Sequence, residues 1–267
     1  MCFYTLILME QTLITANVSP SLKRLYCDEE NKDIEELSPL KSLRTRGQVL
    51  VNKLPGRFAK DPTTGKAFKW PVVEGFKNIN CTSGGQGIWW QLSPMYLGPI
   101  MVSEWGWSHA TDYGEKTFGI EMPLQATCLE NLWQYSKCWS GEDDPATNQP
   151  EKVFFERRAK GWRQEKGQRH VKKGAVTLYS LWGTEHLTYI EARRRIYFPI
   201  YSELVKKTEA YKKLEALLDD GTSIQLLEFD AYPLGDKTWK ECFEDASRSF
   251  GHGMVLACVL QGLEPWK

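Results

Sequence analysis

The pattern of hydrophobic and polar positions divides the chain into a first half of strands and loops and a more helical second half. Short apolar runs at 47–54 and 88–92 are separated by residues rich in Gly and Pro, a pattern typical of strands joined by turns. The Ser-Gly-Gly-Gln-Gly segment at 83–87 predicts a flexible turn, because no phosphate-binding glycine motif surrounds it. We therefore expect residues 47–123 to form strands and loops.

Helical periodicity begins at residue 124 and continues through most of the remaining chain. Residues 124–138 have helical character, and a longer segment from 188 to 218 places its apolar residues on one face. Pro199 lies inside that longer segment, so we expect a kink there or two helices meeting nearby. An apolar run at 224–229 predicts a buried strand, and a last helix is expected from 253 to 263. Together these elements predict an α+β fold that is helix-dominated toward the C-terminus.

Helix ends are marked by their own signals. Thr127 with Glu130 fits a capping box if the first helix starts three residues late, and Thr188 with Glu191 fits a second one. Residues 219–221, Asp-Asp-Gly, predict the end of the long helical segment, because glycine is favoured just after a helix.

Charge and cysteine content limit the classes of protein to consider. The 267 residues include 34 Lys and Arg and 34 Asp and Glu, and this neutrality argues against a dedicated cationic binder of duplex DNA or acidic membranes. An apolar opening at 1–9 is too short to span a bilayer and lacks a basic flank, so no membrane association is expected. The seven cysteines include no CxxC pair, which favours a reduced, intracellular protein. Residues 1–46, which hold an acidic run at 28–36, are interpreted as an N-terminal extension of one domain at 47–267.

The aromatic content is unusually rich in tryptophan. Eleven Trp, eleven Tyr and eleven Phe make up 12% of the chain. A buried indole needs a partner for its N–H group, so such an excess serves a thick core, stacking platforms for flat ligands, or both.

Polar residues on the helix expected at 124–138 form the most informative constellation. Glu130, Gln134 and Lys137 follow an i, i+4, i+7 spacing, and Trp133 lies on the same side. The spacing also fits a solvent-facing ladder. Because the helix is apolar nearly all round, however, a narrow polar stripe on it is expected in a cleft. A half-buried carboxylate beside a lysine and an indole is suited to activating water next to a flat base.

Two further constellations lie near the C-terminus. Residues 228–232, Glu-Phe-Asp-Ala-Tyr, follow the predicted strand, where carboxylates either point into a site or serve as turn and cap residues. Residues 249–253, Ser-Phe-Gly-His-Gly, precede the last helix, where backbone N–H groups favour a phosphate, although a simple glycine-containing cap is the commoner explanation. The four histidines have no metal-ligand spacing, so no metal site and no cofactor are predicted.

A basic stretch leaves a nucleic-acid partner open. Residues 157–173 hold many Lys and Arg side chains around Trp162, which suits either a single-strand contact with Trp162 as a stacking platform or a surface helix whose cations reach solvent. Arg193, Arg194 and Arg195 begin the long helix, and at least one of them is expected to face away from solvent.

Taken in order, residues 90–260 resemble the NADAR (NAD- and ADP-ribose-associated) family. The family helix carries a Glu, a Gln and a Lys, similar to Glu130, Gln134 and Lys137. A long basic-aromatic helix follows, then a strand ending in an acid-x-x-D-x-Y pattern similar to residues 228–232, and a glycine-opened helix similar to 251–257. The family includes N-glycosidases that act on riboflavin-pathway intermediates and on ADP-ribosylated guanine.

The resemblance implies hydrolysis of the N-glycosidic bond of an ADP-ribosylated or phosphoribosylated nucleobase, free or linked to nucleic acid. A carboxylate stabilises the oxocarbenium-like sugar or activates water while a donor helps the base leave. A binding protein for single strands or nucleotides, without hydrolytic activity, is the alternative. The implied catalytic residues are Glu130, Asp230 and Lys137. The implied substrate-binding residues are Trp133, Gln134, Arg194, Tyr232, Gly251, His252 and Gly253.

Overall fold

The computed structural model describes residues 45–54, 73–108, 112–169 and 175–267. The chain divides into two units, Met1–Ser42 and Leu43–Lys267, and all described residues belong to the second. The N-terminal extension predicted at 1–46 therefore lies almost wholly outside the described residues.

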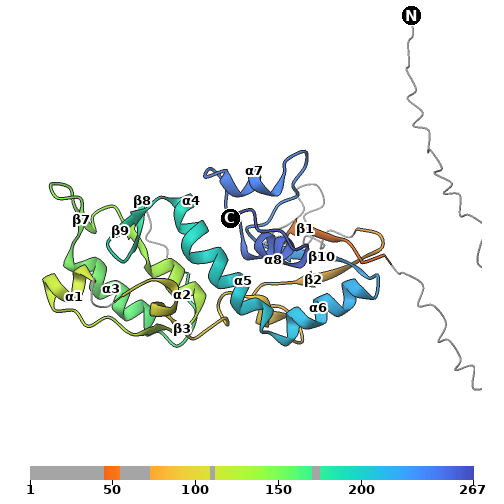
Figure 1. The fold of residues 1–267 in the computed structure, drawn as a ribbon, viewed down its shortest axis with the longest axis horizontal. Coiled ribbons are helices and arrows are strands. Elements are labelled where there is room, and N and C mark those ends of the chain that lie inside the picture. Colours follow the sequence, from red (N-terminus) through yellow and green to blue (C-terminus); the bar gives the residue numbers. More distant parts are fainter. Residues whose placement is uncertain (1–44, 55–72, 109–111, 170–174) are drawn as a thin grey trace, which may run out of the picture. The chain divides into compact units, whose positions relative to one another are not determined.

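A small parallel sheet lies toward the right of the described fold in Figure 1. Its strand order is β1-β10-β2, and β10 (Ser223–Glu228) runs parallel to both β1 (Val49–Lys53) and β2 (Phe76–Asn80). The predicted strand at 224–229 is confirmed to within one residue at each end. A central parallel strand is covered on both faces, which explains why this run is almost continuously apolar.

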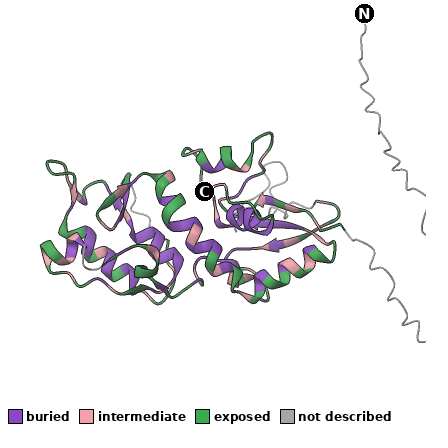
Figure 2. Cartoon of the chain, in the orientation of Figure 1, coloured by how far each residue is buried: buried purple, intermediate pink, exposed green. Residues whose placement is uncertain are grey.

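Helices cover this sheet and supply most of the core. Every residue of α8 (His252–Leu260) is buried, and α8 contacts β1 and β10 (Figure 2). Helix α6 (Glu209–Asp219) is capped by Thr208 and contacts both β10 and the 3₁₀ turn η1 (Trp89–Leu92). The strand-like reading of 88–92 is therefore wrong, because this run is too short and too irregular in its polarity to separate a strand from a buried turn.

The long helical segment is divided where the proline predicted a break. Helix α4 (Tyr189–Ala192) opens with the predicted capping box of Thr188 and Glu191. A π-helical turn, η4 (Arg193–Tyr197), then leads into α5 (Phe198–Lys206), which has Pro199 in its first turn. Pro199 has no N–H group to donate to the preceding turn, so a change of helical register there is expected.

The helix predicted at 124–138 is shorter in the structure. Helix α2 covers Leu129–Tyr135, with β4 (Gln125–Ala126) before it and β5 (Lys137–Trp139) after it. The capping box of Thr127 and Glu130 is wrong, because the Thr127 hydroxyl donates to the Gln164 carbonyl instead. The first N–H groups of α2 are satisfied from outside the helix: Leu129 N donates to the Leu97 carbonyl at 2.8 Å and Glu130 N to the Pro94 carbonyl at 3.0 Å.

A second group of elements packs around α3 (Lys152–Trp162). This group includes the antiparallel sheet β5-β8-β9, with β8 at Thr177–Trp182 and β9 at Glu185–Leu187. The remaining short elements are α1 (Tyr113–Phe118), α7 (Trp239–Glu244), η2 (Val102–Trp105), β3 (Ile100–Met101), β6 (Asp143–Asp144) and β7 (Gln149–Pro150).

Much of the predicted basic surface on α3 is buried. Arg158 is fully buried and pairs with the fully buried Asp112 at 2.5 Å, while Arg157 pairs with Glu142 at 2.8 Å. Trp162 is also fully buried, so its predicted use as an exposed stacking platform is wrong. Lys172 and Lys173 lie outside the described residues.

The described fold combines helices with small sheets, and helical residues outnumber strand residues, as an α+β chain dominated by helices should show. Within the described ranges, no helix is both long enough and apolar enough to cross a membrane.

Candidate functional site

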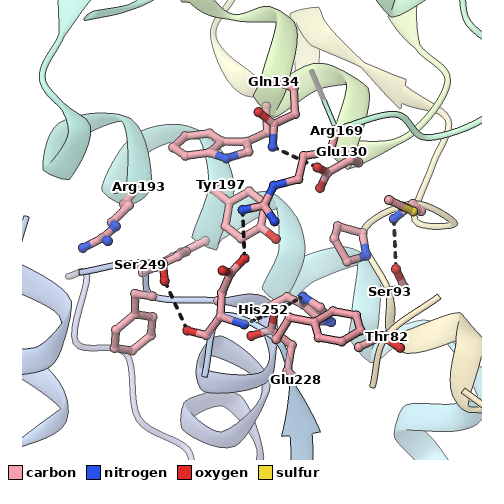
Figure 3. Close-up of a pocket in the computed structure, with 18 of the residues that line it drawn as sticks. Thr82, Ser93, Glu130, Gln134, Arg169, Arg193, Tyr197, Glu228, Ser249 and His252 are labelled. Atoms are coloured by element: carbon pink, nitrogen blue, oxygen red, sulfur yellow. Dashed lines mark hydrogen bonds and ion pairs between the residues drawn. The ribbon is translucent and has the colours of Figure 1, made fainter. Parts of the chain in front are cut away.

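A cavity of about 390 Å³ lies where α2, η4, the end of β10 and the start of α8 meet (Figure 3). The loops at 82–83 and 93–95 close one end of it. Figure 3 shows Glu130 and Gln134 on one wall and Glu228 and His252 on the opposite wall. The cavity therefore gathers residues from four distant parts of the sequence.

The Glu130–Gln134–Lys137 stripe forms one continuous hydrogen-bonded chain. Gln134 Nε2 donates to Glu130 Oε1 at 2.9 Å, and Lys137 Nζ donates to Gln134 Oε1 at 2.9 Å. Glu130 and Gln134 are buried, so the stripe predicted from the sequence faces the cavity and not bulk solvent. Gln134 thus fixes the orientation of the carboxylate and the amine at the same time.

Lys137 is held over an aromatic ring at the cavity wall. Its Nζ lies 4.6 Å from the centroid of the Trp133 ring, a distance suited to a cation–π interaction. Burial lowers the pKa of Lys137 from its usual value to about 8, although Glu130 and Asp230 favour its charged form. The amine is therefore mainly protonated at neutral pH but loses its proton in mildly alkaline solution.

The opposite wall carries a buried carboxylate–histidine pair. Glu228 Oε1 lies 3.6 Å from His252 Nδ1 and accepts a hydrogen bond from Asp230 N at 3.0 Å. His252 Nε2 lies 2.9 Å from the Cys81 carbonyl, which only accepts hydrogen bonds, so Nε2 carries a proton. Burial raises the pKa of Glu228, and the neighbouring His252 partly offsets this effect.

Two arginines bring positive charge to the cavity. Arg169 lies between the two walls in Figure 3, and its Nη2 is 3.2 Å from Asp230 Oδ2. Arg193 is buried with its guanidinium 4.1 Å from the centroid of Tyr189, and it donates to the carbonyls of Phe243, Asp245 and Arg248. Arg169 is half-exposed and accessible to a ligand, whereas Arg193 mainly fixes the wall.

Aromatic rings form a further part of the lining. The Trp133 ring lies 5.1 Å from Tyr197 and 6.2 Å from Tyr189, measured between centroids. These rings, with the cations beside them, make a surface suited to a flat, anionic ligand.

Seven of the ten predicted site residues line the cavity. They are Glu130, Trp133, Gln134, Lys137, Asp230, Gly251 and His252. The structure thus brings together residues of three predicted constellations, at 130–137, 228–232 and 249–253.

The other three predicted residues lie outside the described lining of the cavity. Arg194 points to Phe243, whose ring centroid is 5.3 Å away, and to Glu244 at 3.8 Å. Tyr232 packs under the Arg248 guanidinium at 3.6 Å. Gly253 packs against Glu228, where an added Cβ would lie 2.9 Å from the Glu228 Cβ. The structure thus places these three residues outside the lining of this cavity, and their contact with a ligand stays a prediction.

The sequence also held a signal for residues that were missed. Tyr189, Arg193 and Tyr197 follow one another at intervals of four, so they share one helical face, and all three line the cavity. The expectation that one of the three consecutive arginines turns inward is confirmed by Arg193. Arg169 had no comparable signal, because it lies in a loop.

The described residues contain no group of three or more His, Cys, Asp or Glu side chains placed to hold a metal ion. Comparisons of the chain with protein-family models, with curated proteins and with solved structures found no match.

Proposed function

We propose that the protein is an N-glycosidase that hydrolyses the bond between ribose and an ADP-ribosylated or phosphoribosylated nucleobase. The observation that carries the proposal is the hydrogen-bonded chain from Glu130 through Gln134 to Lys137 along the wall of an aromatic cavity. The ordered resemblance of residues 90–260 to the NADAR family supports the same reaction.

In this proposal Glu130 acts on the sugar. Cleavage of an N-glycosidic bond passes through an oxocarbenium-like ribose, which a nearby carboxylate stabilises. The same carboxylate then accepts a proton from the water that adds to the anomeric carbon. Gln134 donates to one carboxylate oxygen at 2.9 Å and leaves the other oxygen for these roles.

Lys137 is assigned to the leaving base. The base departs with the bonding electron pair and needs a proton, which the Lys137 ammonium can donate because its pKa of about 8 lies close to neutral pH. Trp133 lines the cavity beside the Lys137 amine and would contact the departing base there. Glu130 takes one proton from water and Lys137 gives one to the base, so the enzyme holds the same number of protons before and after turnover.

The remaining wall is assigned to the ribose and its phosphate. Asp230 fixes the ribose hydroxyls, and Arg169 is the cation that a phosphate would contact. Binding of a phosphate to Arg169 would release the Asp230 carboxylate from its ion pair for the sugar.

The test replaces the carboxylate by its amide. Glu130→Gln should abolish release of base from an ADP-ribosylated nucleobase, measured by chromatography, because an amide neither stabilises the cation nor accepts the proton. The melting temperature should stay within a few degrees, because the amide oxygen still accepts the bond from Gln134.

The matched control is Glu156→Gln on α3, which changes an exposed carboxylate that lies 3.6 Å from the Lys152 amine. This control should keep wild-type turnover. Wild-type turnover in Glu130→Gln would overturn the assignment.

A further inference from the structure

A second, shallower cavity of about 310 Å³ adjoins the first. It is lined by Ser83, Gly84, Gly85, Trp90 and Tyr96. Ser83 lines both cavities, and residues 93–95, which line the first, lie in the chain between the two aromatic residues of the second. Thr82 and Ser93 mark this end of the first cavity in Figure 3. The two cavities are therefore neighbours along one continuous wall.

The aromatic residues of the second cavity are unusually exposed. Trp90 is 39% exposed and Tyr96 is 53% exposed, and Trp90 is the one tryptophan among the described residues in the exposed class. Their ring centroids lie 4.7 Å apart at an interplanar angle of 70°, so the rings support each other edge to face. An exposed indole braced in this way presents a free face for stacking.

The backbone around these rings is fixed before any ligand binds. Asn80 Oδ1 accepts from Thr82 N at 3.0 Å, and Gly85 N donates to the Thr82 carbonyl at 2.9 Å. A Cβ at Gly85 would lie 2.5 Å from the Asn80 carbonyl oxygen and 2.9 Å from Trp90 N, so only glycine permits this close approach. The stacking platform is thus preorganised.

We propose that the second cavity binds a second nucleobase of the same ligand, joined to the first cavity through a phosphate-bearing linker. The inference rests on the proposed function for the identity of the first ring. The cations Lys137 and Arg169 line the first cavity, whereas the five residues described around the second carry no charge. The phosphate of the ligand therefore lies between its two bases. The second base, which is uncharged and planar, stacks on Trp90 and Tyr96, where stacking tolerates any base.

Binding measured by calorimetry tests the second cavity without requiring turnover. The full chain is titrated with ADP-ribose and with ribose 5-phosphate, which lacks the nucleobase, and separately with a single-stranded dinucleotide and the corresponding mononucleotide. Tyr96→Ala and Trp90→Ala should each weaken binding of the two-part ligand about tenfold, the usual size of one lost base–aromatic stack, and leave the smaller ligand unchanged.

Two control variants accompany these substitutions. Tyr96→Phe keeps a ring and should retain binding, and Leu178→Ala, at an exposed position outside both cavities, should have no effect. If the alanine variants lose affinity for ADP-ribose alone, the base bound by the second cavity is one joined through a diphosphate. If they lose affinity for the dinucleotide alone, it is the next base of a strand. Equal affinity of both alanine variants and wild type for every ligand overturns the second site.

The outcome is separable from that of the proposed function. If no ligand is hydrolysed but Trp90→Ala and Tyr96→Ala both weaken binding of the two-part ligand, the second site stands and the glycosidase assignment fails. If hydrolysis occurs and the preference for the larger substrate is the same in all variants, the glycosidase stands and the second site fails.

Discussion

At the scale of single residues, Lys137 shows how burial sets chemistry. Its amine is enclosed by Trp133 and Gln134, and desolvation lowers its pKa to about 8. A group that must donate a proton or attract a phosphate works only while it is protonated. Its role therefore has a defined upper pH limit.

We expect kcat/KM to be level between neutral pH and about pH 8 and to fall about tenfold per pH unit above it. The stability of the fold should instead increase as the pH rises over this range. The folded-state pKa of Lys137 lies below the ordinary value of 10.5, so its contribution to the free energy of unfolding rises as the pH increases from about 8 toward 10.5. A pH–rate profile with a urea titration at each pH therefore separates loss of protonation from unfolding.

Lys137→Arg supplies the comparison. A guanidinium stays charged throughout this range, so whatever activity the variant retains should lack the decline centred on pH 8. If kcat/KM of the wild-type protein stays level up to pH 9.5, Lys137 is not the proton donor.

The site residues were predictable where spacing carried information. The spacing of Glu130 and Gln134 on α2 places them on one face, as predicted, whereas Lys137 lies in β5 just after the helix and joins the same hydrogen-bonded chain from there. Arg194 does not line the cavity, because adjacent residues of a helix face different directions. The four-residue spacing of Tyr189, Arg193 and Tyr197 was the signal that Arg193 is the arginine that turns inward.

At the scale of elements, the contact between α2 and α3 positions the candidate site. Gly161 of α3 lies directly against the ring of Tyr135 on α2, where an added Cβ would lie 2.1 Å from two ring atoms. Tyr135 cannot simply turn away, because its hydroxyl donates to Gln164 Oε1 at 3.0 Å. The close approach of the two helices therefore requires glycine.

Gly161→Ala should lower the free energy of unfolding by about 1–3 kcal/mol through overpacking. Helix propensity alone predicts the opposite, a gain of up to about 1 kcal/mol for alanine within a helix. Urea unfolding decides between the two signs. The control is Gly84→Ala, where an added Cβ meets only Thr82 Oγ1 at 3.7 Å, and a change within about 0.5 kcal/mol is expected there. A stabilised Gly161→Ala variant would contradict the packing account.

Elements were predicted best where the pattern was strong and local. The strand at β10, the Thr188 capping box and the division near Pro199 all agree with the sequence. The helix at 124–138 was too long partly because Cys138 and Trp139 of β5 are buried and continue the apolar run of α2. Before α2, Leu124 is exposed and Gln125–Ala126 form the short strand β4. Periodicity alone does not place a helix end beside so short a strand.

At the scale of the whole sequence, the tryptophans lie in two kinds of place. Trp107 and Trp162 lie edge to face at 5.6 Å beside the buried Arg158, where they form core. Trp133 lines the candidate site, and Trp90 is exposed beside the second cavity. Composition predicted an excess of rings, but only the fold shows which of them lie in the core and which line a cavity.

The neutral total charge also acquires a structural meaning. Arg157 and Arg158 of the basic stretch each pair with a buried carboxylate, on Glu142 and Asp112 respectively. A buried cation that is already paired gains little binding free energy from a phosphate, because one ion pair is exchanged for another. The stretch is thus a weaker track for a nucleic-acid backbone than its sequence indicates.

This leads to a prediction for binding of single strands. Each neutralised phosphate contributes about 0.7 to the slope of log K against log salt concentration. With Lys160, Arg163 and Lys166 exposed in the described part of the stretch, we expect a slope no steeper than about −2, measured by fluorescence anisotropy with a labelled oligonucleotide between 50 and 200 mM salt. Lys160→Gln combined with Lys166→Gln should reduce this slope by about 1.4. A slope of about −4 or steeper would require six phosphates or more, and would favour a strand-binding protein over a small-ligand site at Glu130.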